Sequence, residues 1–309
     1  MHPDKPLLIV NPRSGAGLSQ AAWARLAGAI SEGLGPFDTR MTERPGHAQD
    51  IAEAAARERR QLVVAVGGDG TLNEVVNGLM AAGAPKNTEL ALIPRGTGGD
   101  FRRTIEGSKD AVEAARHIRD APAVAIDVGL IHFVDAEGRS AQRHFVNVSS
   151  FGFSAQVAHK ANRSSKQMGA KAAFLGATVR TLIGHSNIDV QIAANGGEPV
   201  RRTVMLGAIG NGQYFGGGMR ICPNAKLNSG AFEFVVVGDL TLATVATKIH
   251  RLYNGSHLSI DRIDSRSVHT LRVDPIDHAE RIFIEVDGET AGYLPASWQV
   301  VPSALHMRL

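Results

Sequence analysis

Hydrophobic and polar positions form two kinds of block that alternate along the chain as far as Ala121. Short strand-like runs are predicted at Leu7–Val10, Phe37–Met41, Leu62–Val66 and Leu90–Ile93. Longer helix-like segments lie between or after them, at 18–33, 47–60 and 73–82. Strands that alternate with helices indicate βαβ units, and therefore a parallel sheet covered on both faces.

The pattern changes after Ala121, where strand-like segments follow one another closely and are separated by Gly, Asn and Asp. The predicted strands are Val124–Ile131, His144–Val148, Ile188–Ala193, Thr203–Ile209, Phe232–Val237, Val268–Val273 and Ile282–Val286. Helical inserts are predicted at Met168–Ile183 and Leu240–Leu252. Closely spaced strands are typical of an antiparallel sandwich. The tail Gln299–Leu309 is also strand-like and could return to the first domain.

Two domains are therefore predicted in a chain of 309 residues, which is long enough to form two hydrophobic cores. The first is a doubly wound α/β domain with a parallel sheet, made of residues 1–122 and completed by the tail 296–309. The second is a β-rich, sandwich-like domain of residues 123–295. A cleft is expected between the two domains.

Composition excludes several classes of protein. The single Cys222 excludes an intrachain disulfide framework and a Cys-based zinc site, and it suits a reducing cytosol. No signal-peptide pattern and no long apolar run are present, so we expect a cytoplasmic protein without a transmembrane segment. The 16 aromatic residues are scattered without a basic stripe, so no nucleic-acid partner is expected. The net charge of +3 suits an anionic nucleotide or membrane surface without deciding for either.

Glycine-bearing turns follow three of the predicted strands. They are Asn11-Pro12-Arg13-Ser14-Gly15, Gly67-Gly68-Asp69-Gly70-Thr71 and Gly96-Thr97-Gly98-Gly99-Asp100. In an open parallel sheet, turns after the strands meet at one edge, where backbone N–H groups and helix N-termini bind anions. One such turn alone would be an ordinary connection, but three at one edge predict a phosphate site. Neither the P-loop motif nor the dinucleotide fingerprint is present.

An acid stands inside two of these turns, Asp69 in the second and Asp100 in the third. A carboxylate beside phosphates is unfavourable unless a cation lies between them, which suggests Mg²⁺ bridging to a nucleotide phosphate. The alternative is that each Asp caps its own turn by accepting hydrogen bonds from backbone N–H groups. We favour the metal role, direct or indirect.

Several strings in the chain resemble a known family. NPRSG, GGDGTLNEVVNGL and PRGTGGDF, in this order and spacing, resemble the diacylglycerol kinase catalytic-domain family, which includes bacterial lipid kinases and the sphingosine and ceramide kinases. NGQYFGGGM, CPNAKLNSG and EVDGE continue the resemblance, which covers essentially the whole chain. GGDGT alone is shared with the NAD kinases. The resemblance implies phosphoryl transfer from ATP to a lipid hydroxyl at a membrane surface, as in phospholipid metabolism; whether such an enzyme is a homodimer stays open.

The resemblance also implies where the nucleotide binds. The implied contacts are Asn11, Ser14, Gly15, Thr42, Gly67, Gly68, Asp69, Gly70, Thr71, Asn73, Glu74, Gly96, Thr97 and Asp100. ATP and Mg²⁺ are the expected cofactors, with the catalytic Mg²⁺ at Asp69 and Asp100 and with Asp69 counted among the catalytic residues.

The proton of the lipid hydroxyl needs an acceptor, and the family's DGE signature supplies two acids, here Asp287 and Glu289. A carboxylate must accept this proton as the γ-phosphoryl group transfers, while positioning and Mg²⁺ supply most of the catalysis. The sequence does not decide between the two acids. We predict Glu289 as the base with Asp287 beside it, and the alternative is that Asp287-Gly288 only forms a turn.

The chain departs from the family at two places. Several bacterial relatives bind a structural Mg²⁺ at a KL-Asp-Asp-Gly string, where this chain has Asn228 and Ser229 before Gly230. Neutral oxygens are weaker Mg²⁺ ligands than carboxylates, so this structural site is predicted to be absent or weak. Gly99 stands where relatives usually carry Asn, and Asp127 matches a family acid that helps to order the second domain or is an ordinary strand-end acid.

A lipid kinase needs an apolar groove, and the helix-like segment 172–183 is apolar over much of its circumference, with basic residues at its edges. The alternative for this segment is a core helix. For the whole chain, the alternatives are an NAD kinase-like enzyme that acts on a soluble dinucleotide, and a non-catalytic nucleotide- or lipid-binding regulator on the same fold.

Overall fold

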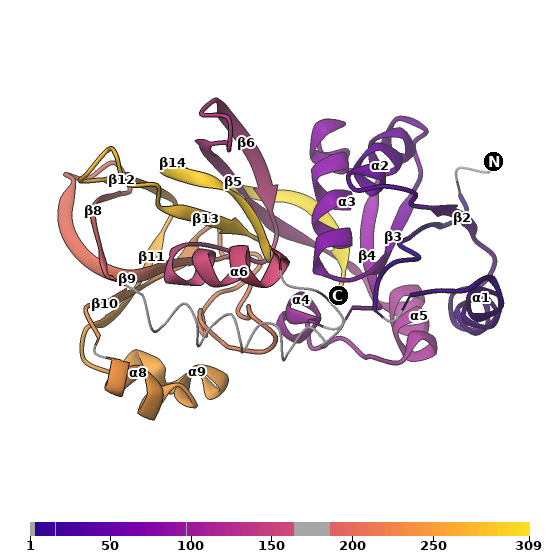
Figure 1. The fold of residues 1–309 in the computed structure, drawn as a ribbon. Helices are drawn as coiled ribbons and strands as arrows, with labels where there is room; N and C mark the ends of the chain where they lie inside the picture. Colours follow the sequence, from indigo (N-terminus) through magenta and orange to yellow (C-terminus); the bar gives the residue numbers. More distant parts are fainter. Residues whose placement is uncertain (1–3, 16, 97, 164–185, 241) are drawn as a thin grey trace. The chain divides into compact units, whose positions relative to one another are not determined.

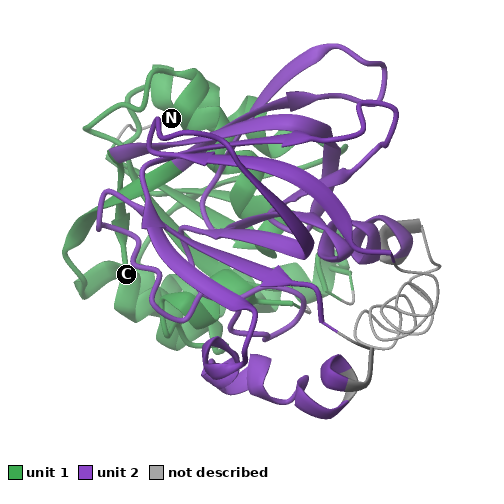
Figure 2. Cartoon of the chain, turned by 90° about the vertical axis from the view of Figure 1, so that its left-hand side faces the viewer, with its two compact units in different colours: residues 1–128, 303–309 green, residues 129–302 purple. Residues whose placement is uncertain are grey.

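The computed structural model describes the chain apart from residues 1–3, 16, 97, 164–185 and 241, and the chain divides into two compact units (Figures 1 and 2). Unit 1 consists of residues 1–128 and 303–309, and unit 2 of residues 129–302. Two strands, β5 (Ala123–Val134) and β14 (Glu289–Arg308), run from one unit into the other. The predicted α/β domain followed by a β-rich domain is confirmed.

Unit 1 is built on a parallel sheet. Its strands lie in the order β2 (Asp38–Met41), β1 (Leu7–Val10), β3 (Leu62–Gly67) and β4 (Glu89–Pro94). The end of β14 joins β4 in parallel through His306 and Met307, so the tail does return to the first domain. The chain leaves β1 towards β2 and leaves β3 towards β4, in opposite directions. The topological switch point, where ligands bind in such sheets, therefore lies between β1 and β3.

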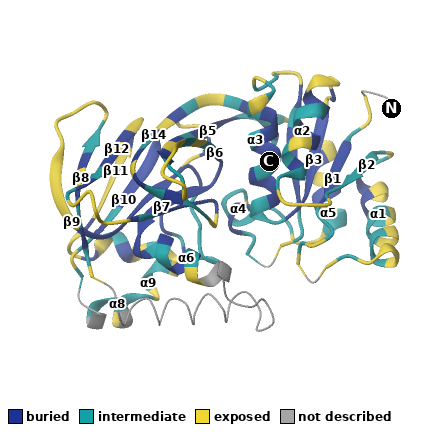
Figure 3. Ribbon diagram, turned by 45° about the horizontal axis from the view of Figure 1, so that its top comes forward, coloured by how far each residue is buried: buried dark blue, intermediate teal, exposed yellow. Residues whose placement is uncertain are grey.

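Helices cover both faces of this sheet. The helices are α1 (Gln20–Leu34), α2 (His47–Arg57), α3 (Asp69–Ala81), α4 (Asp100–Thr104) and α5 (Ala111–Asp120). Helices α1 and α5 share one buried cluster with alternate residues of the strands, and α2 packs against α3 on the opposite face (Figure 1). Burial on both sides explains why β1 and β3 are apolar throughout (Figure 3).

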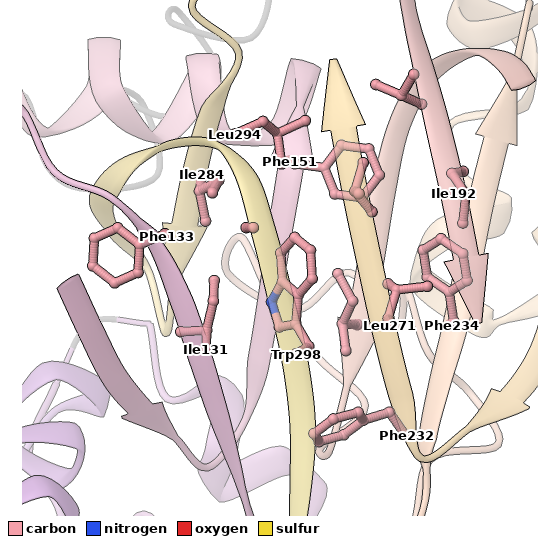
Figure 4. Close-up of a cluster of buried hydrophobic side chains, with 14 of the residues drawn as sticks. Ile131, Phe133, Phe151, Ile192, Phe232, Phe234, Leu271, Ile284, Leu294 and Trp298 are labelled. Carbon is pink, nitrogen blue, oxygen red and sulfur yellow. The ribbon is translucent and has the colours of Figure 1, made fainter. Parts of the chain in front are cut away.

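Unit 2 is antiparallel. Its main strand order is β11 (Ile263–Val268), β10 (Phe232–Gly238), β9 (Val200–Gly210), β7 (Val148–Gly152), β13 (Phe283–Val286) and β14. Strand β8 (Ile188–Ala194) pairs with β9 and with β12 (Thr270–Pro275), β12 also pairs with β14, and β5 pairs with β6 (Ser140–Phe145) and β14. Large side chains from several strands, among them Phe151, Phe234 and Trp298, form the core of this unit (Figure 4).

The helices of unit 2 are short in the part of the chain that the structure describes. They are α6 (Phe153–Arg163), α8 (Leu242–Lys248), α9 (Arg251–Asn254) and a single 3-10 turn at Ser256–Ser259. Among the described residues, no helix has the length and apolar character needed to cross a membrane.

Helix α3 begins at Asp69, inside the second glycine turn, and not at residue 73 as predicted. Gly68 is its N-cap, in an extended conformation, so strand β3 passes almost directly into the helix. The first helical turn contains Gly70 and lacks an apolar period, which is why the hydrophobic pattern missed it. Helices α4, α5 and α6 were not predicted from the sequence.

The predicted strand His144–Val148 is wrong, because it spans the end of β6 and the beginning of β7. Between these strands, Val146 and Asn147 donate their backbone N–H groups to the carboxylate of Asp287, at 3.0 Å each. The acceptor comes from a residue 140 positions along the chain from Asn147. A contact of such long range leaves no mark on the local hydrophobic pattern, so the break was not foreseen.

The predicted strand Val268–Val273 is also divided, between β11 and β12, with His269 at the break. There the backbone N–H of His269 donates to Oδ1 of Asn195 at 2.7 Å, which ends the ladder with β10. The predicted helix Leu240–Leu252 is two shorter helices, α8 and α9. The predicted helix Met168–Ile183 lies outside the described residues.

Candidate functional site

The first and second glycine turns lie side by side at the switch point of unit 1. Asn11, directly after β1, donates from Nδ2 to Oγ1 of Thr71 at 3.0 Å, and its backbone N–H donates to the carbonyl of Val66 at 3.0 Å. Ser14 Oγ in turn donates to the carbonyl of Asn11 at 2.8 Å. These bonds order the turn after β1 against the beginning of α3, as the strand order requires.

Glycine is needed where the second and third turns meet. A Cβ atom added at Gly96 would lie 2.7 Å from Cα of Gly68, closer than real Cβ contacts. A Cβ atom at Gly67 would lie 2.4 Å from Oγ1 of Thr71, whose side chain folds back over the turn. The third turn is also tied to the second by the backbone N–H of Arg95, which donates to the carbonyl of Gly67 at 2.7 Å. The backbones can approach this closely only because the side chains are absent.

The first and third turns meet as well. Gly15 has a φ of +64° and lies where a Cβ atom would be 3.1 Å from the carbonyl oxygen of Arg95. The guanidinium of Arg95 donates from Nη2 to the carbonyl of Gly17 at 2.7 Å. All three turns therefore come together at one edge of the sheet, as predicted. Thr97 of the third turn lies outside the described residues.

Asp69 caps the neighbouring turn. Its Oδ2 accepts the backbone N–H of Asp100 at 3.2 Å and its Oδ1 accepts that of Phe101 at 3.1 Å, at the beginning of α4. The alternative to a metal role for this acid was that it accepts backbone N–H groups of its own turn. The N–H groups that it accepts belong to the third turn instead. A carboxylate has about four lone-pair positions, so two backbone bonds leave Asp69 able to bind a cation as well. Asp69 could therefore hold a Mg²⁺ ion, which prefers carboxylate oxygens as ligands.

Asp100 has a different environment. Its side chain is buried, and Oδ1 accepts a hydrogen bond from Nη1 of Arg103 at 3.0 Å as part of an ion pair. The same guanidinium donates to the carbonyls of Gly98 and Gly99. Arg103 thus fixes the third turn, and a buried acid that is already paired with Arg fits Mg²⁺ less well than Asp69 does. Burial lowers the pKa of the adjacent Arg102 guanidinium, and the charge of Arg103 lowers it further.

Glu74 lies on α3 and caps a second helix. Its two carboxylate oxygens accept the backbone N–H groups of Gly46 and Ala48, at 3.0 Å each, at the beginning of α2. Gly46 is the N-cap of α2 and supplies no side chain of its own. The segment before it begins at Thr42, whose N–H donates to the carbonyl of Val10 at 2.9 Å. Glu74 therefore holds the Thr42 turn next to the glycine turns.

Asn73, another predicted residue of α3, is fully buried. Its side-chain and backbone oxygens both accept hydrogen bonds from Nδ2 of Asn77, at 3.2 and 2.9 Å. Gly70, by contrast, is partly exposed on the first turn of the helix. Of these two predicted nucleotide contacts, Gly70 is the one that presents backbone to solvent.

The two acids of the DGE signature belong to unit 2 and differ in environment. Asp287 is 6% exposed, and its carboxylate accepts the backbone N–H groups of Val146, Asn147 and Val148 at 3.0 to 3.1 Å. Glu289 has a side chain that is 50% exposed and forms an ion pair with Arg143 at 2.8 Å. The carboxylate of Asp287 thus holds the link between β6 and β7, while Glu289 is accessible.

A third acid near this signature was missed. Glu285 lies on β13, is 3% exposed, and accepts a hydrogen bond from Ser150 Oγ at 2.6 Å and another from the backbone N–H of Gly288. The signal was present in the sequence, because a charged residue inside an otherwise apolar strand is rarely fully buried without a specific partner. Arg103 was also missed, although its i,i+3 spacing from Asp100 on α4 is a local signal in the sequence.

The loop that contains Asn228 and Ser229, where the sequence predicts no strong structural Mg²⁺ site, is closed by the side chain of Ser229. Ser229 Oγ lies 3.1 Å from the carbonyl oxygen of Lys226 and 2.9 Å from that of Ala231, within hydrogen-bond distance of both. Asn228 and Ser229 supply only neutral oxygens. Neutral oxygens of this kind are weaker Mg²⁺ ligands than carboxylates. Among the described residues of the whole chain, no three His, Cys, Asp or Glu side chains form a metal cluster.

Comparison with known protein families places both units. The sequence model of the YegS C-terminal NAD kinase beta sandwich-like domain matches residues 147–308, and that of the diacylglycerol kinase catalytic domain matches residues 5–131. This chain belongs to the diacylglycerol kinase catalytic-domain family. The predicted resemblance is confirmed, and the protein is a kinase of that family.

Diacylglycerol kinases from bacteria match along nearly the whole chain. The diacylglycerol kinases of Staphylococcus carnosus and Staphylococcus haemolyticus are 25% and 26% identical over 291 residues, which is 94% of this chain and 90% and 84% of theirs. A crystal structure from Bacillus anthracis, assigned as a diacylglycerol kinase, has a TM-score of 0.76 at 25% identity and covers 98% of this chain and 96% of its own. Yeast NADH kinase in complex with NADH has a TM-score of 0.51 at 12% identity, covers 99% of this chain and 83% of its own, and shares the fold alone.

Proposed function

We propose that this kinase transfers the γ-phosphoryl group of ATP to the hydroxyl group of a lipid at a membrane surface. The observation that supports the proposal most strongly is the meeting of three glycine turns at the switch point between β1 and β3, with α3 beginning inside the second turn. Backbone N–H groups and the N-terminus of a 13-residue helix at one point suit a polyphosphate. Family membership and relatives named as diacylglycerol kinases favour a lipid as the acceptor.

In this proposal, unit 1 binds the nucleotide and unit 2 the lipid. The phosphates lie against the glycine turns, with Asn11 and Ser14 from the first turn and Thr71 from the second nearby. Glu74 holds the turn after Thr42 in place by accepting the backbone N–H groups of Gly46 and Ala48. Mg²⁺, when bound, neutralises the negative charge that the phosphate oxygens carry during transfer. Asp69 is the residue that we propose to hold it.

We propose that Glu289 accepts the proton of the lipid hydroxyl. The hydroxyl oxygen forms a bond to the γ-phosphorus, the bond from that phosphorus to the β-γ bridging oxygen breaks, and ADP leaves with the electron pair. The hydroxyl proton passes to the carboxylate of Glu289. Asp287 is less suited, because its oxygens already accept three backbone N–H groups in a buried site. Arg143 pairs with Glu289 in the resting structure and has to give way as the acceptor arrives.

The test uses the purified full chain with γ-labelled ATP, Mg²⁺ and vesicles that contain diacylglycerol, a sphingoid base or phosphatidylglycerol, with NAD as a soluble acceptor in a parallel arm. Mass spectrometry identifies the labelled product. We expect label on a lipid and a fall in kcat of about 100-fold or more for Glu289→Gln, because general-base catalysis contributes on the order of 10²–10⁴. Glu137→Gln, at an exposed acid paired with Arg139, is the matched control and should leave the rate unchanged.

Each other outcome contradicts a defined part of the proposal. Label on NAD alone would make the protein an NAD kinase-like enzyme. ATP binding without label on any acceptor would indicate a non-catalytic regulator. Undiminished lipid phosphorylation by the Glu289→Gln variant would show that Glu289 is not the base.

A further inference from the structure

Glu285 is a buried carboxylate whose bonds reach the turn of the DGE signature. On β13 it lies opposite Ser150 of β7, whose hydroxyl donates to its Oε2 at 2.6 Å. Its Oε1 accepts the backbone N–H of Gly288, three residues further along the chain. Burying a carboxylate without partners costs much free energy, so the two bonds are what makes this position tolerable for an acid.

The same hydroxyl connects Glu285 to a third element. Ser154, in the first turn of α6, donates from Oγ to Oγ of Ser150 at 2.9 Å. A chain of hydrogen bonds therefore runs from α6 through β7 to the carboxylate of Glu285 and on to the backbone of the DGE turn. Strand β7, helix α6 and the turn are held in register by one side chain.

The turn itself is a tight hairpin with positive φ at both central residues. Val286 and Glu289 pair across it, so Asp287 and Gly288 are the two residues of a tight hairpin. Both have positive φ, +47° for Asp287 and +90° for Gly288, as a type I′ turn requires. Asp-Gly is a preferred residue pair for this turn, and two carboxylates tie the turn to its surroundings. The carboxylate of Asp287 holds the turn from one side, and that of Glu285 holds it from the other.

We infer that Glu285 is a positioning residue for Glu289: by fixing the N–H of Gly288 it sets the direction in which the next residue leaves the turn. This inference rests on the proposed function of Glu289 as the base. A glutamine at position 285 can reproduce both contacts, because its amide oxygen accepts from Gly288 and its amide N–H₂ donates to the hydroxyl of Ser150. An alanine can reproduce neither.

The experiment compares Glu285→Ala and Glu285→Gln in the full-length enzyme. For the alanine variant we expect kcat to fall by about 10²-fold, the usual effect of a misplaced reacting group, with KM for ATP unchanged because the glycine turns belong to unit 1. The glutamine variant should retain most of the activity. Hydrogen exchange at Gly288 gives a readout without catalysis, and it should become faster in the alanine variant alone.

Glu233 provides a matched control in the same unit. It is 6% exposed and accepts the backbone N–H of Asn224 and the hydroxyl of Ser265, at 2.6 Å each. It lies on β10, and strands β9 and β7 separate β10 from β13. Glu233→Ala should lower stability as Glu285→Ala does, while the kcat of the folded protein and the exchange at Gly288 stay the same.

The outcomes separate this inference from the proposed function. Unchanged kcat and unchanged exchange at Gly288 in the Glu285→Ala variant would overturn the positioning role. An equal loss of kcat in the Glu233→Ala variant would overturn it as well, because any buried acid would then have the same effect. A wild-type protein that phosphorylates no lipid would refute the proposed function, and faster exchange at Gly288 in the alanine variant would still support the fixing of the turn by Glu285.

Discussion

Replacement of Glu74 by alanine tests whether α2 depends on a carboxylate from α3. The wild-type side chain accepts two backbone N–H groups at the beginning of α2, from Gly46 and Ala48, at 3.0 Å each. These are among the N–H groups that have no partner within the helix itself. Alanine removes both acceptors and also the negative charge that interacts favourably with the positive end of the helix.

The expected loss in the free energy of unfolding follows from these contacts. A hydrogen bond to a charged group contributes about 1.5–3 kcal/mol, which would give about 3–6 kcal/mol for two. Gly46 is only partly buried, so water replaces one of the bonds in the variant. Deletion of a helix cap costs about 0.5–2 kcal/mol in other proteins. We therefore expect a loss of about 2–3 kcal/mol for Glu74→Ala and about 1 kcal/mol for Glu74→Gln, which keeps one acceptor.

The assay is guanidinium denaturation together with hydrogen exchange of the amides in the first turn of α2. Glu53→Ala is the control, because Glu53 forms an i,i+4 ion pair with Arg57 on the surface of the same helix and should contribute about 0.3–0.5 kcal/mol. A Glu74→Ala variant within about 0.5 kcal/mol of wild type, with slow exchange retained at Ala48, would refute the reasoning. It would mean that water caps the helix as well as Glu74 does.

Three further predictions concern other parts of the chain. Gly96→Ala pushes the third turn away from Gly68, so it should lower the free energy of unfolding by about 1–3 kcal/mol and weaken ATP binding. Gly28→Ala, in open space on α1, should raise the free energy of unfolding by about 0.5–1 kcal/mol. Burial, and to a smaller extent the charge of a neighbouring histidine, lowers the pKa of His144; the stability it contributes is present above pH 6.5 and is lost as the pH falls below that value. Ser229→Asp should give unit 2 a Mg²⁺-dependent stability that the wild type lacks.

Each of these predictions has a direct measurement. For the glycine variants, denaturation curves and titration with ATP are compared, and equal stability of both variants would contradict the close approach of the turns. Denaturation at pH 7.5 and 5.5 tests His144. The difference in the free energy of unfolding between the two pH values should become smaller in a His144→Asn variant, but not after substitution of the exposed His250. Thermal unfolding of the nucleotide-free protein with Mg²⁺ or EDTA tests the Ser229 loop, and a Mg²⁺ effect on unit 2 of the wild type would contradict its closure by the hydroxyl.

Most of the framework of the site follows from the sequence alone. The apolar runs Leu7–Val10 and Leu62–Val66 have to be buried on both faces, which makes their sheet parallel and brings their following turns to one edge. Glycine at positions 68 and 96 marks the place where two backbones approach closely, and glycine at position 67 leaves room for the side chain of Thr71. These are local signals, because they depend on the period of the chain and on the size of a side chain, and each is visible in a window of a few residues.

The partners of the acids were decided only by the tertiary structure. Asp69 caps α4, Glu74 caps α2, and Asp287 holds the link between β6 and β7, over separations of 31, 26 and 139 residues or more. In the sequence, an acid that caps, an acid that binds a metal and an acid that accepts a proton are the same side chain. What distinguishes them is which backbone N–H groups or cations lie within about 3 Å, and only the packing of distant segments determines that.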